Sequence, residues 1–595
     1  MSHEQVMEVT SQLNMEFDNE VDQRESQCVD ICASMILAHD LPFHFFEHEV
    51  IRKYSEFLNP NAVTPTRNVI EAYVSHLYSK EKLKLKQELA TIPNRISLSF
   101  DLWESCTTET YICLTAHYVD ADWKLNSKLL NFCLVYPPTG GEMCERIIEL
   151  LNDWGIEKKI CSLTLDDSFE NDILREQLKT RLGLQNGLLC DGEFFRVHCF
   201  ARVLKLIVEE GLKLVSDVVF KIRESIWFVR DEKSRREKFK ECVEKVGGVD
   251  SSVRLHLDKS MSVNSTYLML ESALKYRSVF ESLHLYDDNY KLCPTVEEWK
   301  RVKKICAFLL PFSETANMIN GTTHPTSNLC FLQVWKVQCV LVESLRDEDE
   351  VIKGMAERMM SEFEKYWDEY SVILALGAVL DPRMKFSTLA YCYSKLDPST
   401  CEQKLQQIKR KLYMLFDEYS SKKIVQDQSS NMPLQKKLKS LSHSLFDELK
   451  VHHQQLVTQT GKSQLDIYLD ESDLDFRCYE DMDVLQWWKS NNNRFPDLSI
   501  LACDLLNVPF TTVTSDFEFC MGSSVFNKYK DRMLPMNVET RMCTRSWLFN
   551  FVSNDGEDDG DDDFEEMTNE VDGDEKMEKA SNDYDFEDDD NDGDD

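Results

Sequence analysis

Two stretches of this sequence place an aspartate at the end of an apolar run. In RISLSFDLW, apolar residues alternate with polar ones up to Asp101, and in KICSLTLDD a second run leads to Asp166. Alternation of this kind is typical of a half-buried strand. We therefore expect two strands, each with a carboxylate at or near its end.

A carboxylate in this place has two common roles. Aspartate is a frequent turn residue, so the more ordinary role is to cap the turn that follows the strand. The alternative is to bind a divalent metal together with a second carboxylate. Mg²⁺ and Mn²⁺ take oxygen ligands, and a pair of such ions can activate a hydroxyl and stabilise the leaving oxygen in phosphodiester cleavage. The residues alone leave both roles open.

The elements around Asp101 and Asp166 indicate an α/β fold. Strands are predicted at 96–100, 111–118, 128–135 and 159–165, and helices at 141–154 and 168–182. The second and third strands are close enough in the chain to be antiparallel neighbours. The order β-β-β-α-β-α is that of a ribonuclease-H-like mixed sheet. With the first strand in the centre, the ends that carry the two aspartates lie side by side.

After this core the pattern is mainly helical, and we expect a large all-α insertion that splits the sheet domain. Helices are predicted at 196–214 and 216–239, and a later stretch rich in Ser, Gln and Lys predicts a partly disordered linker. The predicted division is 1–26 disordered, 27–92 N-terminal helical region, 93–190 first part of the ribonuclease-H-like core, 191–420 helical insertion with a further ribonuclease-H-fold region, 421–464 linker, 465–551 C-terminal block and 552–595 disordered acidic tail.

The charge of the chain is negative and uneven. The formal net charge is −37, and residues 555–595 carry 23 acidic and two basic residues, which leaves −16 for the preceding residues. Most of the surface should repel nucleic acid and anionic membranes, so any DNA-binding surface has to be a local patch. Acidic runs usually keep a chain soluble and disordered, and they can also bind basic partners such as chromatin proteins.

The cysteines predict neither a disulfide framework nor a zinc site. The 20 cysteines are scattered, no secretory signal opens the chain, and no apolar run is long enough to span a bilayer. Cys28 and Cys32 are spaced like zinc ligands but lack a second pair at matching distance. We expect reduced thiols, no zinc, no membrane association, and a place in the cytosol or the nucleus.

Basic residues gather at two helical stretches, the predicted helix 68–89 and the region after residue 230. Because Glu81 and Glu88 balance the first stretch, the ordinary interpretation is a solvated helix face, and a weak nucleic-acid contact surface is the alternative. The candidate DNA-binding residues are Arg67, Lys80, Lys82, Lys84, Lys86, Lys233, Arg235 and Arg236.

The block 465–551 carries more apolar and aromatic surface than so small a unit can bury alone. It must pack either on another part of the chain or on a second copy, and the residues leave both open. The candidate dimerisation residues are Trp487, Trp488, Phe495, Pro496, Leu498, Leu501, Leu505, Leu506, Trp547 and Leu548.

Several longer motifs follow one another along the chain. They include LPFHFFEHE (41–49), NPNAVTPTRNVI (59–70), LSFDLWES (98–105), LTLDDSFEND (163–172), AVLDPRMKF (378–386) and WWKSNNNRFPDLSILACDLLNVPFTTVTSDFEF (487–519). In number, order and spacing they resemble the hAT superfamily of DNA transposases. Within it, they resemble the host-adopted plant proteins of the SLEEPER type, which are labelled zinc finger BED domain-containing.

The resemblance implies a ribonuclease-H-like core that a helical insertion splits and a C-terminal hAT dimerisation region completes. It also implies a homodimer, or a heterodimer with related hAT proteins. In active members an Asp-Asp-Glu triad binds two metal ions. Its first two positions match Asp101 and Asp166, and its third position is Asp516 here.

The sequence departs from the active pattern at positions that handle metal and DNA. Asp516 is one methylene shorter than the family's glutamate, and a ligand displaced by about an ångström can cost roughly a hundredfold in rate. Arg202 replaces the histidine of the family's Cys-x-x-His motif, and Val263 replaces a tryptophan that stacks on a base in active relatives. The Cys and His ligands of the BED finger are also missing from this sequence, so we expect the usual terminal-repeat-binding module to be missing.

We therefore expect not an enzyme but a host-adopted, transposase-like nuclear factor that dimerises and associates weakly or non-specifically with DNA. It should require no cofactor, although residual Mg²⁺ or Mn²⁺ could bind at Asp101 and Asp166. The alternatives are an active metal-dependent transposase or nuclease, and a protein-interaction scaffold that no longer binds DNA.

Overall fold

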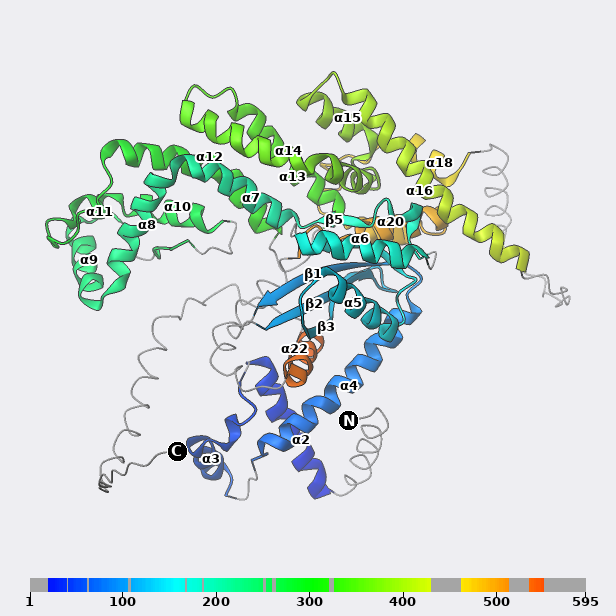
Figure 1. The fold of residues 1–595 in the computed structure, drawn as a ribbon, viewed down its shortest axis with the longest axis horizontal. Coiled ribbons are helices and arrows are strands. Elements are labelled where there is room, and N and C mark those ends of the chain that lie inside the picture. The colour runs from blue at the N-terminus through cyan, green and yellow to red at the C-terminus, as the bar shows by residue number, and fades with distance from the viewer. Residues whose placement is uncertain are drawn as a thin grey trace, which may run out of the picture. The chain divides into compact units, whose positions relative to one another are not determined.

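The computed structural model describes most of the chain between Glu20 and Phe549 (Figure 1). The described residues are 20–39, 41–60, 64–104, 109–165, 169–184, 187–249, 253–258, 264–319, 326–429, 462–512 and 535–549. The predicted acidic tail lies outside them. The stretch 1–26 is predicted to be disordered, but its last residues are helical because the first described helix begins at Glu20.

A five-stranded mixed sheet lies at the centre, with the strand order β3-β2-β1-β4-β5. The strands are β1 (Ile96–Glu104), β2 (Thr110–Val119), β3 (Leu125–Val135), β4 (Ile160–Leu165) and β5 (Arg196–His198). β2 pairs antiparallel with both β1 and β3, whereas β4 runs parallel to β1. The predicted α/β fold, the central first strand and the antiparallel second and third strands are confirmed.

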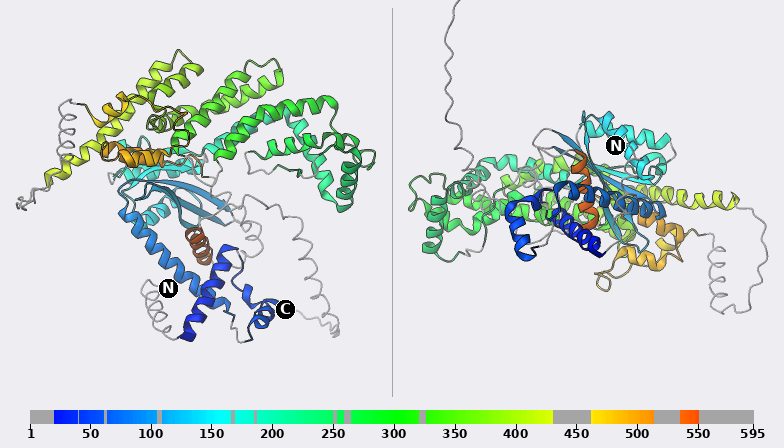
Figure 2. Two further views of the ribbon diagram at one scale, coloured as in Figure 1. Left: turned by 180° about the vertical axis from the view of Figure 1, so that it is seen from behind. Right: turned by 90° about the horizontal axis from the view of Figure 1, so that it is seen from below.

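Each face of the sheet is covered by helices because apolar side chains point both ways along the strands. On one face, Leu98 and Phe100 of β1 pack in one core with α4 (Arg67–Thr91), α5 (Gly140–Trp154) and α6 (Phe169–Leu184). On the other face, Tyr111, Cys113 and Phe132 pack against α22 (Pro535–Phe549). α22 therefore joins the sheet from a point far along the chain, and it lies beside α4 and α2 (Figure 2).

The predicted amphipathic helix after β3 forms as its sequence indicates. The Thr139 side chain caps α5 at Glu142, and Gly155 ends the helix in the left-handed conformation with φ 69°. Met143, Ile147 and Trp154 recur at helical spacing and are buried. The helix thereby fixes β4 in the direction that places its end beside β1.

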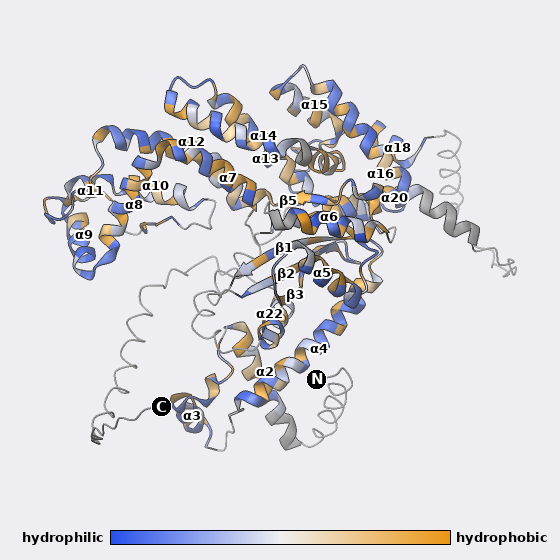
Figure 3. Cartoon of the chain, viewed as in Figure 1, coloured by the Kyte–Doolittle hydropathy of each residue, from blue (hydrophilic) through white to orange (hydrophobic). Residues whose placement is uncertain are grey.

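A helical region follows the sheet, and hydrophilic and hydrophobic residues alternate along its helices (Figure 3). Its helices are α7 (Phe200–Leu212), α8 (Ser216–Asp231), α9 (Lys233–Val246), α10 (Ser265–Lys275), α11 (Arg277–Leu283), α12 (Val296–Ile319), α13 (Ser327–Ser344), α14 (Glu350–Val379), α15 (Lys385–Leu396) and α16 (Cys401–Ser429). Short 3-10 turns lie at η2 (Leu189–Gly192) and η3 (Lys213–Val215).

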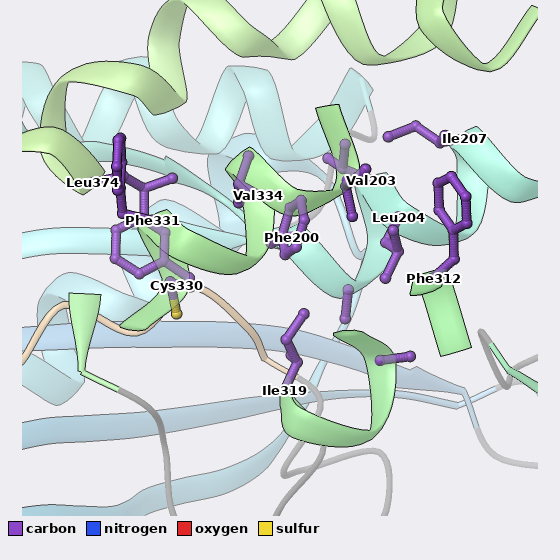
Figure 4. Close-up of a cluster of buried hydrophobic side chains, with 14 of the residues drawn as sticks. Phe200, Val203, Leu204, Ile207, Phe312, Ile319, Cys330, Phe331, Val334 and Leu374 are labelled. Carbon is purple, nitrogen blue, oxygen red and sulfur yellow. The ribbon is translucent and has the colours of Figure 1, made fainter. Parts of the chain in front are cut away.

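The helical region and the sheet share one apolar core. Side chains of α7 face those of α12, α13 and α14 (Figure 4). The labelled members are Phe200, Val203, Leu204, Ile207, Phe312, Ile319, Cys330, Phe331, Val334 and Leu374. Because Val197 of β5 and Cys161 of β4 belong to the same core, the insertion is packed onto the sheet.

Two helix predictions in this region are wrong. The stretch 196–214 was expected to be one helix, but Arg196–His198 pairs with β4 as an edge strand and α7 begins at Phe200. The predicted helix 216–239 is two helices, because Glu232 adopts an extended backbone (ψ 142°) between α8 and α9. In both stretches the apolar residues keep a helical spacing although the helix is interrupted, so the sequence pattern does not reveal the interruption.

In its described residues, the C-terminal block adds three short helices to the helical region and then α22. They are α18 (Gln464–Asp470), α19 (Val484–Asn491) and α20 (Pro496–Leu506). The predicted linker 421–464 is helical at its start, because α16 continues to Ser429. The N-terminal region contains α2 (Glu20–Ala38), η1 (Phe45–Glu47) and α3 (Glu49–Leu58). No helix in the described part of the chain is long and apolar enough to cross a membrane.

A buried ionic cluster in the stretch AVLDPRMKF anchors the C-terminal block to the helical region. The Asp381 carboxylate is inaccessible and accepts from the Asn328 side chain (2.8 Å) and from the Arg383 guanidinium (2.7 Å). Arg383 in turn donates to the carbonyls of Tyr479 and Glu480, both at 3.0 Å. The cluster thus connects α13 and the α14–α15 turn to the loop before α19.

Substituting Asp381 tests this anchor. The variant Asp381→Ala leaves the buried Arg383 charge without its carboxylate, and we expect a loss of about 3–5 kcal/mol in the free energy of unfolding of this region. Urea unfolding followed by tryptophan fluorescence measures the loss. The matched control is Asp470→Ala, which removes an exposed pair with Lys462 and should change stability by less than about 1 kcal/mol. Equal unfolding midpoints for both variants would contradict the anchor.

Candidate functional site

Asp101 lies on the central strand of the sheet, where its neighbours are defined by the strand register. It is opposite Cys113 of β2, and its side chain is half-buried. Burial raises the pKa of the Cys199 thiol to about 11, and the charge of the nearby Asp101 carboxylate is the second cause. The Cys199 sulfur accepts from the Thr512 hydroxyl at 3.3 Å. Thus β1, the β5–α7 junction and the segment after α20 (Pro496–Leu506) meet near Asp101.

The end of β4 lies beside the same place. Ser99 of β1 pairs in parallel with Thr164 of β4, and the Leu165 carbonyl accepts from the Cys199 amide at 3.0 Å. Leu165 immediately precedes Asp166. Asp166 and Asp516 lie outside the described residues, so the distances within the predicted triad are not defined. In the part of the chain that is described, no three His, Cys, Asp or Glu side chains form a metal-binding group.

The segment after α20 forms hydrogen bonds to β1, to β4 and to the first residue of α7. The Ser97 hydroxyl donates to the Asn507 side chain at 2.6 Å, and the Thr164 hydroxyl donates to the Pro509 carbonyl at 2.6 Å. The Phe200 amide donates to the Phe510 carbonyl at 2.7 Å. These hydrogen bonds join the elements around Asp101, and sequence reasoning missed them because short polar side chains between apolar ones look like an ordinary loop.

A second polar group missed from sequence lies on the face of the sheet that carries Asp101. The His117 ring on β2 is buried and has Ser99 Oγ 2.8 Å from Nε2 and Ser127 Oγ 2.6 Å from Nδ1. One histidine therefore links β1, β2 and β3 through their side chains. It acts as a structural bridge, because both ring nitrogens are occupied by hydroxyl groups of the chain.

The positions that differ from active hAT proteins have distinct surroundings. Arg202 is exposed on the first turn of α7, three residues after the buried Cys199. Val263 lies outside the described residues and directly precedes Asn264, the N-cap position of α10. An arginine has no hydrogen-bond acceptor, so Arg202 cannot take the place of a neutral histidine.

The basic residues of α4 are largely occupied by neighbouring carboxylates. The ion pairs are Arg67–Glu71, Lys82–Asp153, Lys84–Glu81 and Lys86–Asp153, at 2.7, 2.9, 3.3 and 3.4 Å. Lys80 is exposed and forms no ion pair within the described chain. Because pairs of this kind are weak at a surface, the lysines stay available to a stronger anion such as phosphate.

The second basic stretch forms the first turn of α9, on a different part of the fold. Arg235 pairs with Asp231 and Glu232 at 3.1 Å each, and its guanidinium lies 4.3 Å from the Phe228 ring centroid. Lys233 is exposed and Arg236 is half-buried. The two basic stretches therefore pack against different elements, α4 against α22 and α9 against α8 and α11.

Most of the candidate dimerisation residues are buried within their own chain. Trp488 donates to the Leu380 carbonyl at 2.9 Å and is fully buried. The other buried members are Phe495, Leu498, Leu501, Leu505 and Leu506. Of the two alternatives left open by the sequence, packing on another part of the chain accounts for these side chains. Trp487, Pro496 and Trp547 are half-buried and Leu548 is exposed.

Large exposed apolar side chains gather on α3, outside the C-terminal block. α3 has no buried residue, and one of its faces carries Val50, Tyr54, Phe57 and Leu58, with 76%, 61%, 84% and 64% of their surfaces exposed. Their spacing places them on a single stripe of the helix. A contiguous exposed stripe of large apolar side chains is typical of an interaction surface.

The sheet order, the acid on its central strand and the inserted helices define the class of protein as a ribonuclease-H-like α/β protein with an all-α insertion. Comparison with family models agrees. The matches are the ZBED1 RNase-like domain (99–194), the ZBED1 RNase-like helical domain (197–308), the hAT-like transposase RNase-H fold (328–419) and the hAT family C-terminal dimerisation region (464–548).

Known proteins extend the match over most of the chain. Zinc finger BED domain-containing protein RICESLEEPER 2 of Oryza sativa subsp. japonica is 33% identical over 87% of this chain and 73% of its own length. DAYSLEEPER of Arabidopsis thaliana is 31% identical over 88% and 74%. The putative AC transposase of Zea mays is 28% identical over 86% and 64%. The chain belongs to the hAT family, in the group of transposase-derived plant SLEEPER proteins.

Proposed function

We propose that this chain is a host-adopted hAT transposase-like protein that no longer cleaves or joins DNA. It acts in the nucleus as a dimeric, DNA-associated regulatory factor. One observation carries the proposal: the fold around Asp101 is kept, while the third acidic position of the triad holds Asp516. The changes at Arg202 and Val263 support it, because they remove an imidazole and a base-stacking ring.

The retained aspartates explain what metal chemistry is left. Asp101 and Asp166 supply carboxylate oxygens, which suit Mg²⁺ or Mn²⁺. Such ions activate a hydroxyl for phosphodiester chemistry when they are held in the correct geometry. With a shortened third carboxylate that geometry is not reached, so residual metal binding at Asp101 and Asp166 is expected without a reaction. The protein requires no cofactor for the proposed role.

A cleavage assay tests the loss of catalysis. The full chain with Mn²⁺ should neither nick nor join supercoiled plasmid DNA above the background of Asp101→Ala. The triple variant Asp516→Glu, Val263→Trp, Arg202→His restores the family's residues and serves as the matched comparison. Nicking by the native chain that Asp101→Ala abolishes would contradict the proposal.

A second candidate function is a protein-interaction scaffold that does not bind DNA. The ion pairs on α4 and α9 favour it, because the carboxylates partly neutralise the basic residues before any ligand arrives. The neutralisation is nevertheless incomplete, because Lys80 and Lys84 are exposed. Weak DNA association is therefore the better fit to this surface. An electrophoretic shift assay separates the two candidates.

We expect the full chain to shift DNA weakly, without sequence preference, and with an affinity that falls steeply as salt rises. The double variant Lys80→Ala, Lys84→Ala should weaken binding and reduce the salt slope by about two, since each lysine–phosphate contact contributes about 0.9.

Lys245→Ala with Lys300→Ala is the control for total charge. A version that ends at Asn554 shows whether the acidic tail competes. A sequence-specific footprint would contradict weak, non-specific binding, and no shift at low salt in either version would favour the scaffold.

Dimer formation follows from the family's C-terminal dimerisation region, but the surface must be one that is exposed. We propose that the stripe on α3 contributes to contact with a second copy. Its side chains are apolar, while the predicted contact residues Leu498 and Leu501 are sealed inside the chain.

Light scattering of the full chain should give twice the mass of the 69.5 kDa monomer at micromolar concentration. The variant Tyr54→Ser, Phe57→Ser should shift the protein toward monomer without unfolding it, because neither side chain is buried. Leu285→Ser removes an isolated Leu that is 74% exposed and is the control. A monomeric mass for the native chain rules out the dimer, and an unchanged dimer in the double variant rules out α3.

A further inference from the structure

A pocket of about 320 Å³ lies between α8 and the segment 253–258. Its lining residues are Arg223, Glu224, Trp227, Leu257 and Asp258. None of them belongs to the Asp101 site, to the basic stretches or to the apolar stripe on α3. The pocket thus has no part in the proposed function.

The most unusual member of the lining is Trp227. Half of its surface is exposed, although Ile226 and Val229 on the same helix are buried. Within the described chain the Trp227 indole makes no ring pair and carries no cation. Its neighbour Phe228, in contrast, carries the Arg235 guanidinium at 4.3 Å. The Phe228 ring therefore already has a cation of the chain over its face, whereas the neighbouring Trp227 indole has none among the described residues.

The charged residues of the pocket differ in their hydrogen bonding. Arg223 donates two hydrogen bonds to the Asp258 carboxylate, at 2.7 and 2.5 Å, so these two charges neutralise each other. Glu224 is half-buried and forms no hydrogen bond or ion pair in the described part of the chain. Because Glu224 and Trp227 are three residues apart on one helix, they lie on the same face. The pocket presents an aromatic surface beside a carboxylate, and its lining of one arginine and two acidic residues carries a net charge of −1.

We propose that this pocket binds the cationic side chain of a lysine or arginine from a basic protein segment. A cation over an indole face is attracted by the ring, and a nearby carboxylate adds a charge-assisted hydrogen bond. Leu257 contacts the aliphatic stem of such a side chain. A nucleic acid fits less well, because its phosphates would meet Glu224 and Asp258.

Photo-crosslinking tests the pocket in the full chain, where the acidic tail is also expected to attract basic peptides. The probe is a decapeptide of alternating Ala and Lys, with one Lys replaced by a diazirine analogue that keeps its ammonium group. Trypsin releases residues 224–230 as one peptide, since Arg223 and Arg230 flank it. We expect cross-links in this peptide. Their yield should fall about tenfold in Trp227→Ala and about threefold in Glu224→Gln.

Two further variants keep the test sharp. Trp227→Phe retains an aromatic face and should keep part of the yield, whereas Phe220→Ala removes another exposed ring of α8 that does not line the pocket and should leave the yield unchanged. Cross-links confined to residues 552–595, or equal yields in Trp227→Ala and the native chain, overturn the proposal. Protection of peptide 224–230 by a single-stranded oligonucleotide but not by unlabelled peptide assigns the pocket to nucleic acid and overturns it as well.

Discussion

The fold depends on one buried carboxylate, that of Asp504 on α20. One of its oxygens accepts from the Arg95 amide at 2.8 Å, where the chain enters the central strand. The other accepts from the Tyr419 hydroxyl of α16 at 2.6 Å. Burial, and then the charge of Asp504, raise the pKa of Tyr419 far above its usual value, so the phenol stays a donor. Three distant segments are thereby joined at the start of the strand that carries Asp101.

This junction explains why the C-terminal block is inseparable from the core. Asn507 forms hydrogen bonds with Ser97 of β1 and with the Arg95 carbonyl just before the strand, and Thr512 donates to Cys199 beside Asp101. Removing the block would leave these polar groups and the apolar face of α20 open to water, at a cost that no local rearrangement recovers. The block's apolar stripe is therefore explained by folding, and self-association has to use a surface that folding leaves exposed.

The sequence was sufficient for the parts of the fold that depend on local pattern. Alternation predicted β1 to β4, and an amphipathic pattern that ends at Gly155 predicted α5, because each of these elements buries one face at its own period. β5 was not predicted, because three residues at a sheet edge are too few to show a period. The buried polar residues that join distant segments were not predicted either. Asp381, Asp504 and Asn507 find their partners across long separations, and only the assembled fold defines those partners.

The candidate site divides in the same way. The place of Asp101 at the central strand followed from local pattern, and its parallel neighbour β4 followed from the order of elements. The sequence does not show which acidic residue each basic side chain pairs with. The sequence predicted Glu81 and Glu88 as the balancing charges on this helix, whereas Lys82 and Lys86 both pair with the single carboxylate of Asp153, which is supplied by α5.

The contacts around Asp101 hold the scaffold independently of any reaction at the site. His117, Cys199 and Thr512 tie the strands around Asp101 through hydrogen bonds and burial, and none of these contacts requires a metal or a DNA end. Under the proposed function, the shortened third ligand removes catalysis without removing what holds the sheet together. The contacts that stabilise the sheet and the carboxylates proposed to bind metal are different residues of the same site, so a change in one set does not require a change in the other. The surfaces that then matter are those the fold leaves uncovered, the stripe on α3 and the indole of Trp227.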